Sequence, residues 1–187
     1  MHISMYNPDV KSIEATIERF AELKKYNPDF TVQVTELDVS IYKSDSDGEI
    51  TITPEILLEQ AYRYQELFDL FKEQTVKGNI DMTLVWGVTD NDSWLNNFPV
   101  KGRKNAPLLF DTNFKSKPAY WALVEPSSIA VKTKGIEAKK VEEVNDLAWK
   151  LSNSIEVNKR IEGKEDTKAN VKVVWDKENI HINANIT

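Results

Sequence analysis

The chain has 187 residues, of which 41% are hydrophobic and 29% charged, enough apolar content for one globular domain or one domain and part of another. A formal net charge of −6 argues against a nucleic-acid partner, because phosphate binding needs clustered lysine and arginine. The sequence has no run of roughly 18 apolar residues and predicts no membrane-spanning helix. It contains no cysteine, which excludes disulfide bonds and thiolate metal sites.

The first two thirds of the chain read as three strand-then-helix units. A strand stub at residues 2–4 precedes a helix for which Asn7 is the expected N-cap and Pro8 the first helical residue. A strand at 31–42 precedes a helix that starts at Thr53-Pro54 and stops near Gly78. A strand at 80–87 and a long loop precede a short helix at 116–124. This order predicts an α/β fold with parallel strands.

Two architectures fit the three units: a small three-stranded layer, or the last part of a (β/α)8 barrel, which takes about 250 residues. After residue 126 the composition shifts to lysine and glutamate, and residues 171–186 alternate as a β-hairpin. We therefore expect a partial α/β domain at 1–125, a linker at 126–140 and the beginning of a β-rich, sandwich-like domain at 141–187.

The strand at 31–42 carries two acids where it should end. Strict alternation places Val34, Glu36 and Asp38 on one face. Ligand sites of parallel α/β sheets lie at the carboxyl ends of the strands, which makes these carboxylates candidates for chemistry, with a solvated strand end as the simpler alternative. His2 ends the neighbouring strand and lies within expected reach of a carboxylate there.

Two tryptophans follow the third strand. Trp86 ends it, and Trp94 lies in the polar loop VTDNDSW. Tryptophans near a strand end usually pack, but a hydrophobic core seldom needs one in such a polar loop. Sugars place their C–H faces on indole rings and their hydroxyls on carboxylates, so the combination suggests a carbohydrate ligand.

These residues resemble a known family. His2 in HIS, Glu36 and Asp38 in VTELDVS, Trp86 and Trp94 in TLVWGVTDNDSW, and LLFDTNFKSKPAYWAL at 108–123 occur in the order and spacing of glycoside hydrolase family 10, the endo-β-1,4-xylanases. The resemblance covers about residues 1–125. It implies the C-terminal portion of a (β/α)8 barrel, from about strand 6 to strand 8.

The resemblance also implies roles. Glu36 matches the nucleophile of a retaining glycosidase, His2 and Asp38 match the residues that support it, and Trp86 and Trp94 match the walls of the sugar subsite. The implied partner is xylan or a xylo-oligosaccharide, with no metal or other cofactor. The implied full-length protein is a monomer, secreted to the extracellular space, with its signal peptide outside this chain.

One family residue is missing. The acid/base glutamate stands in an Asn-Glu pair on the family's fourth strand, and this chain contains no Asn-Glu pair. Retaining glycosidases need two carboxyl groups about 5–5.5 Å apart, and Asp38 is badly placed for the second role because it follows Glu36 along one strand. We therefore expect a xylanase fragment that is close to inactive alone.

The C-terminal region resembles the opening of a family 9 carbohydrate-binding module, through NDLAWKLSNSIEV around Trp149 and the hairpin containing Trp175. We expect both tryptophans in a β-sandwich core, with sugar binding as the alternative. Two other functions stay open for the whole chain: a non-catalytic carbohydrate-binding protein that uses Trp86 and Trp94, and a plain structural α/β domain.

Overall fold

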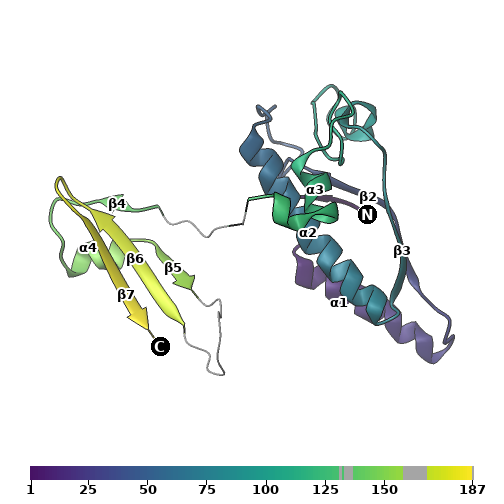
Figure 1. The fold of residues 1–187 in the computed structure, drawn as a ribbon, viewed down its shortest axis with the longest axis horizontal. Coiled ribbons are helices and arrows are strands. Elements are labelled where there is room, and N and C mark those ends of the chain that lie inside the picture. The colour runs from purple at the N-terminus through teal and green to yellow at the C-terminus, as the bar shows by residue number, and fades with distance from the viewer. Residues whose placement is uncertain (131, 133–136, 158–167, 187) are drawn as a thin grey trace. The chain divides into compact units, whose positions relative to one another are not determined.

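A computed structural model of the chain describes residues 1–130, 132, 137–157 and 168–186. The chain divides into two compact units, residues 1–131 and 132–187, whose elements are labelled in Figure 1. The first is a sheet with helices, and the second is mostly β-strand. No helix in the described ranges is long and apolar enough to cross a membrane.

The first unit is built on a parallel sheet with the strand order β1-β2-β3, as the alternating strands and helices predicted. Its strands are β1 (His2–Ser4), β2 (Val32–Ser40) and β3 (Ile80–Val85). Its helices are α1 (Val10–Ala21), α2 (Pro54–Val76) and α3 (Pro118–Val124), with short 3₁₀ segments η1 (Glu22–Lys25), η2 (Asp90–Asp92), η3 (Trp94–Asn96) and η4 (Pro126–Ser128).

Local capping signals set where the two long helices begin. Thr53 caps α2 through its side chain, and Pro54 is the first helical residue, as predicted. The expected cap of α1 is wrong, because Asp9 rather than Asn7 accepts the backbone N–H of Ser12. Asp9 takes this position since its carboxylate offers a strong acceptor to the open N–H groups of the first turn.

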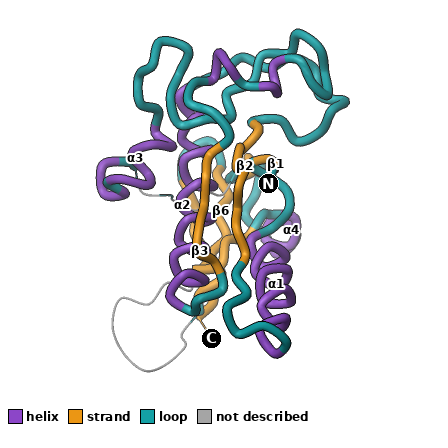
Figure 2. Tube along the Cα trace, turned by 90° about the vertical axis from the view of Figure 1, so that its right-hand side faces the viewer, coloured by secondary structure: helices purple, strands orange, loops and turns teal. Residues whose placement is uncertain are grey.

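Helices α1 and α2 cover one face of the sheet, and Figure 2 looks onto the other face, with the strands in front. The core between them joins buried residues of β2 to apolar residues of both helices. Its members include Val34, Leu37, Val39, Ile13, Ile17, Tyr64, Leu67 and Phe71. The buried residues of α1 and α2 recur at helical spacing, so one side of each helix faces the sheet.

The alternation expected along β2 is wrong at its centre. Val34, Leu37 and Val39 are all buried in the helix-covered core, whereas Thr35 is exposed and Glu36 is partly exposed. The pairing with β3 shifts register between Val34 and Leu37, as in a β-bulge. Because a bulge adds one residue to a strand, Val34 and Glu36 point to opposite faces.

The second unit is a four-stranded sheet with one short helix. Its elements are β4 (Lys139–Lys140), α4 (Asp146–Leu151), β5 (Ser154–Val157), β6 (Ala169–Trp175) and β7 (Ile180–Ile186). The predicted hairpin is confirmed, since β6 and β7 pair antiparallel from Trp175 opposite Ile180. Trp149 is partly buried, and Trp175 keeps 39% of its surface exposed, so Trp175 is not a core residue of the described unit.

Candidate active site

The parallel pairing of β1 and β2 brings three predicted site residues together. His2 lies directly opposite Asp38 in the register. Its Nδ1 is 2.7 Å from Asp38 Oδ2, and its Nε2 is 3.2 Å from Glu36 Oε2. An ionised carboxylate only accepts hydrogen bonds, so each acid accepts from the ring nitrogen that faces it when that nitrogen carries a proton. The imidazole thus bridges the two acids.

The two carboxylates have different surroundings. Asp38 is fully buried, and its Oδ2 also accepts the indole N–H of Trp94 at 2.8 Å. The Glu36 side chain keeps 41% of its surface exposed on the sheet face that the helices leave open. Glu36 is therefore the acid that a ligand can reach, and Asp38 is a buried acceptor that holds two aromatic side chains in place.

Trp94 is fixed from several directions. It begins η3, its indole lies edge-on to the His2 ring with centroids 4.8 Å apart, and it stacks on Phe98 at 5.5 Å. The sequence placed Trp94 near the acids but did not single out Phe98, a residue that is 62% exposed. The sequence signal that could have identified Phe98 is its position four residues after Trp94 in the same loop.

Trp86 lies at the carboxyl end of β3 with 47% of its surface exposed. Its backbone N–H donates to Leu37 O at 2.7 Å, which carries the sheet pairing one residue beyond β3. Gly87 follows with φ +126°, and a Cβ there would come within 2.8 Å of Leu108. This turn needs glycine. No ring contact joins Trp86 to Trp94 in the described ranges, so they are two separate aromatic surfaces.

A buried ion pair supports the loop that carries Trp94. Asp90 and Lys117 are 2.9 Å apart, and Lys117 also donates to the carbonyls of Ala106 and Leu108. Burial raises the pKa of the Asp90 carboxyl and lowers the pKa of the Lys117 ammonium, while their attraction opposes both shifts. Sequence reasoning read the loop as polar and exposed and missed this pair, although Lys117 lies in the quoted SKPAY motif.

The buried residue Asn105 connects the loop that carries Trp94 to the end of β2. Its Oδ1 accepts the backbone N–H of Ile41 at 3.2 Å, and its Nδ2 donates to Ser40 Oγ at 2.9 Å. Its own N–H donates to Asn96 Oδ1 at 2.9 Å. No sequence signal marked Asn105, because its partners lie far away along the chain. The position of Trp94 is thus linked to the strand that carries Glu36.

Arg103 holds the polar loop that follows β2. One nitrogen, Nη1, donates to the carbonyls of Ser44, Asp45 and Asp47 at 2.9–3.3 Å, and the guanidinium lies 3.9 Å over the Tyr42 ring. Three carbonyl acceptors and an aromatic face offset part of the cost of burying this cation, although its Nε has no hydrogen-bond partner among the described residues. The loop at the carboxyl end of β2 is therefore closely held.

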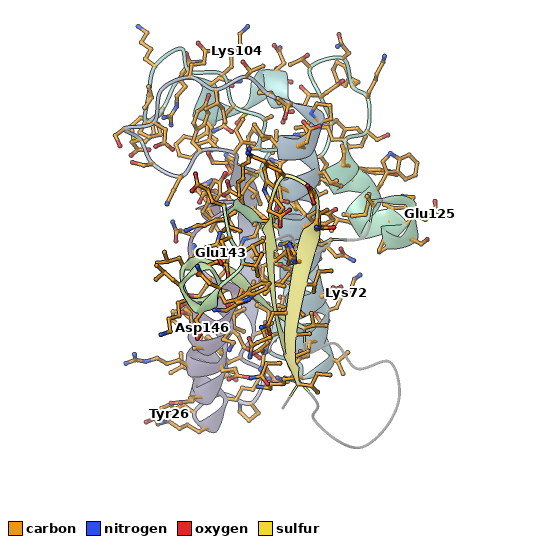
Figure 3. All side chains as sticks on the ribbon, turned by 90° about the vertical axis from the view of Figure 1, so that its left-hand side faces the viewer. Tyr26, Lys72, Lys104, Glu125, Glu143 and Asp146 are labelled. Atoms are coloured by element: carbon orange, nitrogen blue, oxygen red, sulfur yellow. The ribbon has the colours of Figure 1, made fainter. Side chains whose placement is uncertain are left out.

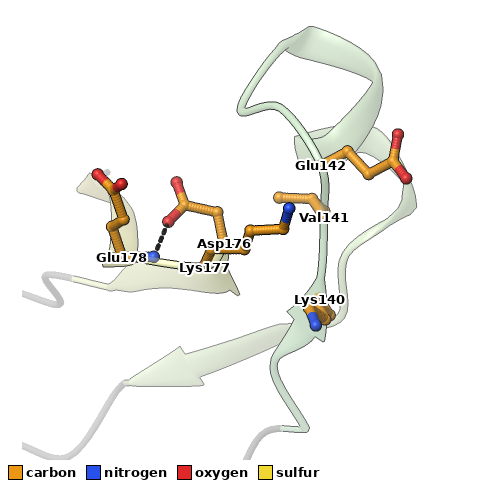
Figure 4. A pocket seen from close by; sticks show the side chains of 6 residues that line it. All are labelled: Lys140, Val141, Glu142, Asp176, Lys177 and Glu178. Atoms are coloured by element: carbon orange, nitrogen blue, oxygen red, sulfur yellow. Dashed lines mark hydrogen bonds between the residues drawn. The ribbon is translucent and has the colours of Figure 1, made fainter.

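The second unit carries a pocket of its own. This pocket lies between the end of β4 and the β6–β7 turn and is lined by Lys140, Val141, Glu142, Asp176, Lys177 and Glu178 (Figure 4). It contains none of the predicted site residues. Within the part of the chain that the structure describes, no group of three or more acidic, histidine or cysteine side chains is arranged to hold a metal ion.

Residues 1–126 match the family model described as Glycosyl hydrolase family 10. The chain belongs to glycosyl hydrolase family 10. The predicted resemblance and fold class are confirmed: the first unit is a C-terminal portion of this family's (β/α)8 barrel, and its three strands correspond to about strands 6 to 8. Residues 141–187 match the model described as Carbohydrate family 9 binding domain-like, as the tail motifs predicted.

Individual family 10 relatives show the same kinship. The chain is 43% identical over 189 residues to "Endo-1,4-beta-xylanase C" of Paenibacillus barcinonensis, an alignment that covers 97% of this chain and 17% of that protein. It is 50% identical over 130 residues to "Thermostable celloxylanase" of Thermoclostridium stercorarium, covering 68% of this chain and 32% of the relative.

Solved structures of family 10 proteins are also similar to this chain. "Structure of GH10 from Paenibacillus barcinonensis" superposes with a TM-score of 0.66 and 53% identity, covering 72% of this chain and 37% of that one. The family 10 chain described here therefore spans a minor part of the length of the relatives that it matches.

Proposed function

We propose that this chain supplies the nucleophile side of the active site of a retaining endo-1,4-β-xylanase. The observation that carries the proposal is the bridge of His2 between Glu36 and Asp38 at the carboxyl ends of two adjacent strands. Membership of glycosyl hydrolase family 10 and the printed names of the xylanase relatives support the reaction class.

In this proposal Glu36 attacks the anomeric carbon of a xylosyl unit. A bond forms between Glu36 and that carbon, and the glycosidic C–O bond breaks with its electron pair on the leaving oxygen. Water later hydrolyses the glycosyl ester and returns the carboxylate. His2 and Asp38 support Glu36: His2 orients the carboxylate through Nε2, and Asp38 fixes the ring of His2 through Nδ1.

The leaving oxygen needs a proton from a second carboxylic acid. Asp38 does not fit that role, because it is fully buried and its Oδ2 already accepts from His2 and Trp94. The chain has no Asn-Glu pair to match the family's acid/base residue. We therefore expect the 187-residue chain alone to hydrolyse xylan at least about 10²- to 10⁴-fold more slowly than an enzyme with the acid.

The proposed substrate is xylan or a xylo-oligosaccharide. The exposed ring of Trp86 is available to the C–H face of a pyranose unit. Trp94, whose ring contacts Phe98 and His2, would border the unit at Glu36. A polymeric substrate of the plant cell wall is found outside cells, so we propose extracellular action by a secreted, monomeric full-length protein.

Trapping of the glycosyl-enzyme tests the nucleophile. In 2,4-dinitrophenyl 2-deoxy-2-fluoro-β-xylobioside the dinitrophenolate leaves without a proton, so the first step does not need the acid residue, and the fluorine slows hydrolysis of the ester. In the full gene product containing this chain we expect one added fluoroxylobiosyl group, on the peptide that contains Glu36, by mass spectrometry.

Two variants make this test specific. Glu36→Gln should take no label, because an amide is a poor nucleophile, whereas the exposed Glu59→Gln on α2 should label at the native rate. A label on a different carboxylate, or none, would remove Glu36 from the nucleophile role. Binding of xylo-oligosaccharides without any label would instead favour a non-catalytic carbohydrate-binding protein.

A further inference from the structure

Trp94 and Phe98 stack on each other but have different surroundings. The indole N–H of Trp94 is engaged by Asp38 at 2.8 Å, its ring contacts His2 edge-on, and one face stacks on Phe98. A ring held in this way has little free surface to accept a second sugar. Its main contribution is to hold the positions of the groups around Glu36.

Phe98 has the opposite character. Its ring lies nearly parallel to the Trp94 ring, with 25° between the planes, and 62% of the residue is exposed. Its backbone N–H donates to Trp94 O at 3.1 Å, so the same turn that positions Trp94 positions Phe98. One ring face is therefore backed by a fixed indole, and much of the remaining ring surface is open to solvent.

An exposed phenylalanine is not unusual, because much of any protein surface is apolar. Tyr26 shows the ordinary case: it is 78% exposed, and it lies at the opposite end of the first unit from Lys104, a residue of the loop that contains Phe98 (Figure 3). Phe98 differs from Tyr26 in one respect. It is connected through Trp94 and Asp38 to the histidine that contacts Glu36.

The chemistry of the ring limits what binds to it. A benzyl side chain has no hydrogen-bonding group, so it takes an apolar surface, and the C–H face of a pyranose is such a surface. We propose that Phe98 stacks on a second xylosyl unit of the same substrate chain, next to the unit at Glu36. This inference rests on the proposed xylanase function and adds a residue that extends the site along the polymer.

Binding measurements test the inference without chemistry. In the full gene product carrying Glu36→Gln, which binds without turnover, we expect Phe98→Ala to weaken xylotetraose binding by about five- to tenfold in a calorimetric titration. Phe98→Tyr keeps an aromatic face and should bind within about twofold of the parent. Tyr26→Ala, the matched control, should leave the affinity unchanged. Equal affinity in Phe98→Ala and its parent would overturn the inference.

A reagent with one sugar separates sugar stacking from a structural role. Single-sugar 2,4-dinitrophenyl 2-deoxy-2-fluoro-β-xyloside reaches only the unit at Glu36, so Phe98→Ala in the native background should label at the native rate. A slower rate would show that Phe98 acts by supporting Trp94 and would overturn the inference. If Phe98→Ala weakens xylotetraose binding but Glu36 takes no label, only the assignment of Glu36 as nucleophile is overturned. If the protein does not bind xylotetraose at all, the nucleophile assignment and the role of Phe98 are both overturned.

Discussion

At the scale of single residues, Asp38 shows how burial changes the role of an acid. One residue, Leu37, separates it from Glu36 in a motif where either carboxylate could react. Asp38 has no exposed surface, and its Oδ2 accepts from both His2 and Trp94, while the Glu36 side chain is 41% exposed. Hydrogen bonds to a charged acceptor are stronger than neutral ones, so we propose that Asp38 positions His2 and Trp94.

Asp38→Asn tests this positioning role. The amide keeps the volume but loses the charge, so its oxygen can accept from His2 and Trp94 only as a neutral acceptor. Charge-assisted hydrogen bonds contribute about 1.5–3 kcal/mol, so we expect the rate of Glu36 labelling to fall by roughly 10- to 100-fold. Asp81→Asn, an exposed change on β3, is the control. A rate within twofold of native would contradict the assignment.

Asp176 provides a pH test at the turn between β6 and β7. Its carboxylate accepts the backbone N–H groups of Glu178 and Asn179 and contacts His181 Nε2 at 2.8 Å. These hydrogen bonds, led by the Glu178 amide, lower the pKa of Asp176 from 3.8 to about 2. A lowered folded-state pKa adds stability above pH 4 that is lost as the pH falls toward 2.

The expected midpoint for Asp176 in a carboxyl carbon NMR titration is therefore about 2. Asp176→Asn should remove this part of the acid sensitivity of the β6–β7 hairpin, whereas Asp146→Asn in α4 should retain it. A midpoint near the ordinary value of 3.8 would show that the turn does not hold the ionised carboxylate.

At the scale of elements, the loop between β3 and α3 depends on the buried pair of Asp90 and Lys117. Asp90 also accepts the backbone N–H of Leu108, so one carboxylate joins the loop start, the segment before α3 and α3 itself. The polar sequence TDND at residues 89–92, considered alone, predicts a solvated loop. Only the approach of Lys117, 27 residues later, shows that the first aspartate points inward.

Removal of one partner should be more damaging than removal of both. Lys117→Met leaves the Asp90 carboxylate buried without a counter-ion, which costs about 3–5 kcal/mol of unfolding free energy. Asp90→Asn combined with Lys117→Met should recover part of that loss. Lys115→Met, an exposed lysine two residues away, should change stability little. Urea unfolding of the four proteins measures the differences, and equal losses for both lysines would contradict the buried-pair account.

The β-bulge in β2 is a second element-level feature. Strict alternation assigned Val34 and Glu36 to one face, but the register shift before Leu37 sends Val34 toward the helices and Glu36 toward the open face. The acids therefore do not continue a row of valines. A local sequence pattern cannot show a bulge of this kind, because it depends on how many residues the neighbouring strand places opposite.

At the scale of the whole molecule, the three-stranded sheet of the first unit is only partly covered. Helices lie on one face, and the opposite face is open in Figure 2. In the described ranges β1 and β3 each pair on one edge only, and large apolar side chains including Phe20, Leu84 and Val88 are exposed. Unpaired strand edges and apolar patches favour association with other chains.

We therefore expect the 187-residue chain by itself to bind anilinonaphthalene sulfonate and to unfold over a broad temperature range. A longer family 10 chain that carries further strands on these edges should show little dye binding and a sharp transition. Near-ultraviolet circular dichroism on heating, with dye fluorescence, makes the comparison. A sharp and reversible transition of the 187-residue chain would show that its sheet is stable without further cover.

The sequence by itself determined the parallel strand order, the start of α2 at Thr53-Pro54, the β6–β7 hairpin and the family, because these depend on capping, periodicity and short motifs. Its spacing also placed His2, Glu36 and Asp38 at neighbouring strand ends. The tertiary structure decided which of the two acids a ligand can reach and that Val34 lies on the helix-covered face of the sheet. It also decided that Phe98 is more exposed to solvent than Trp94. Those properties depend on register and burial, which join residues far apart in the chain.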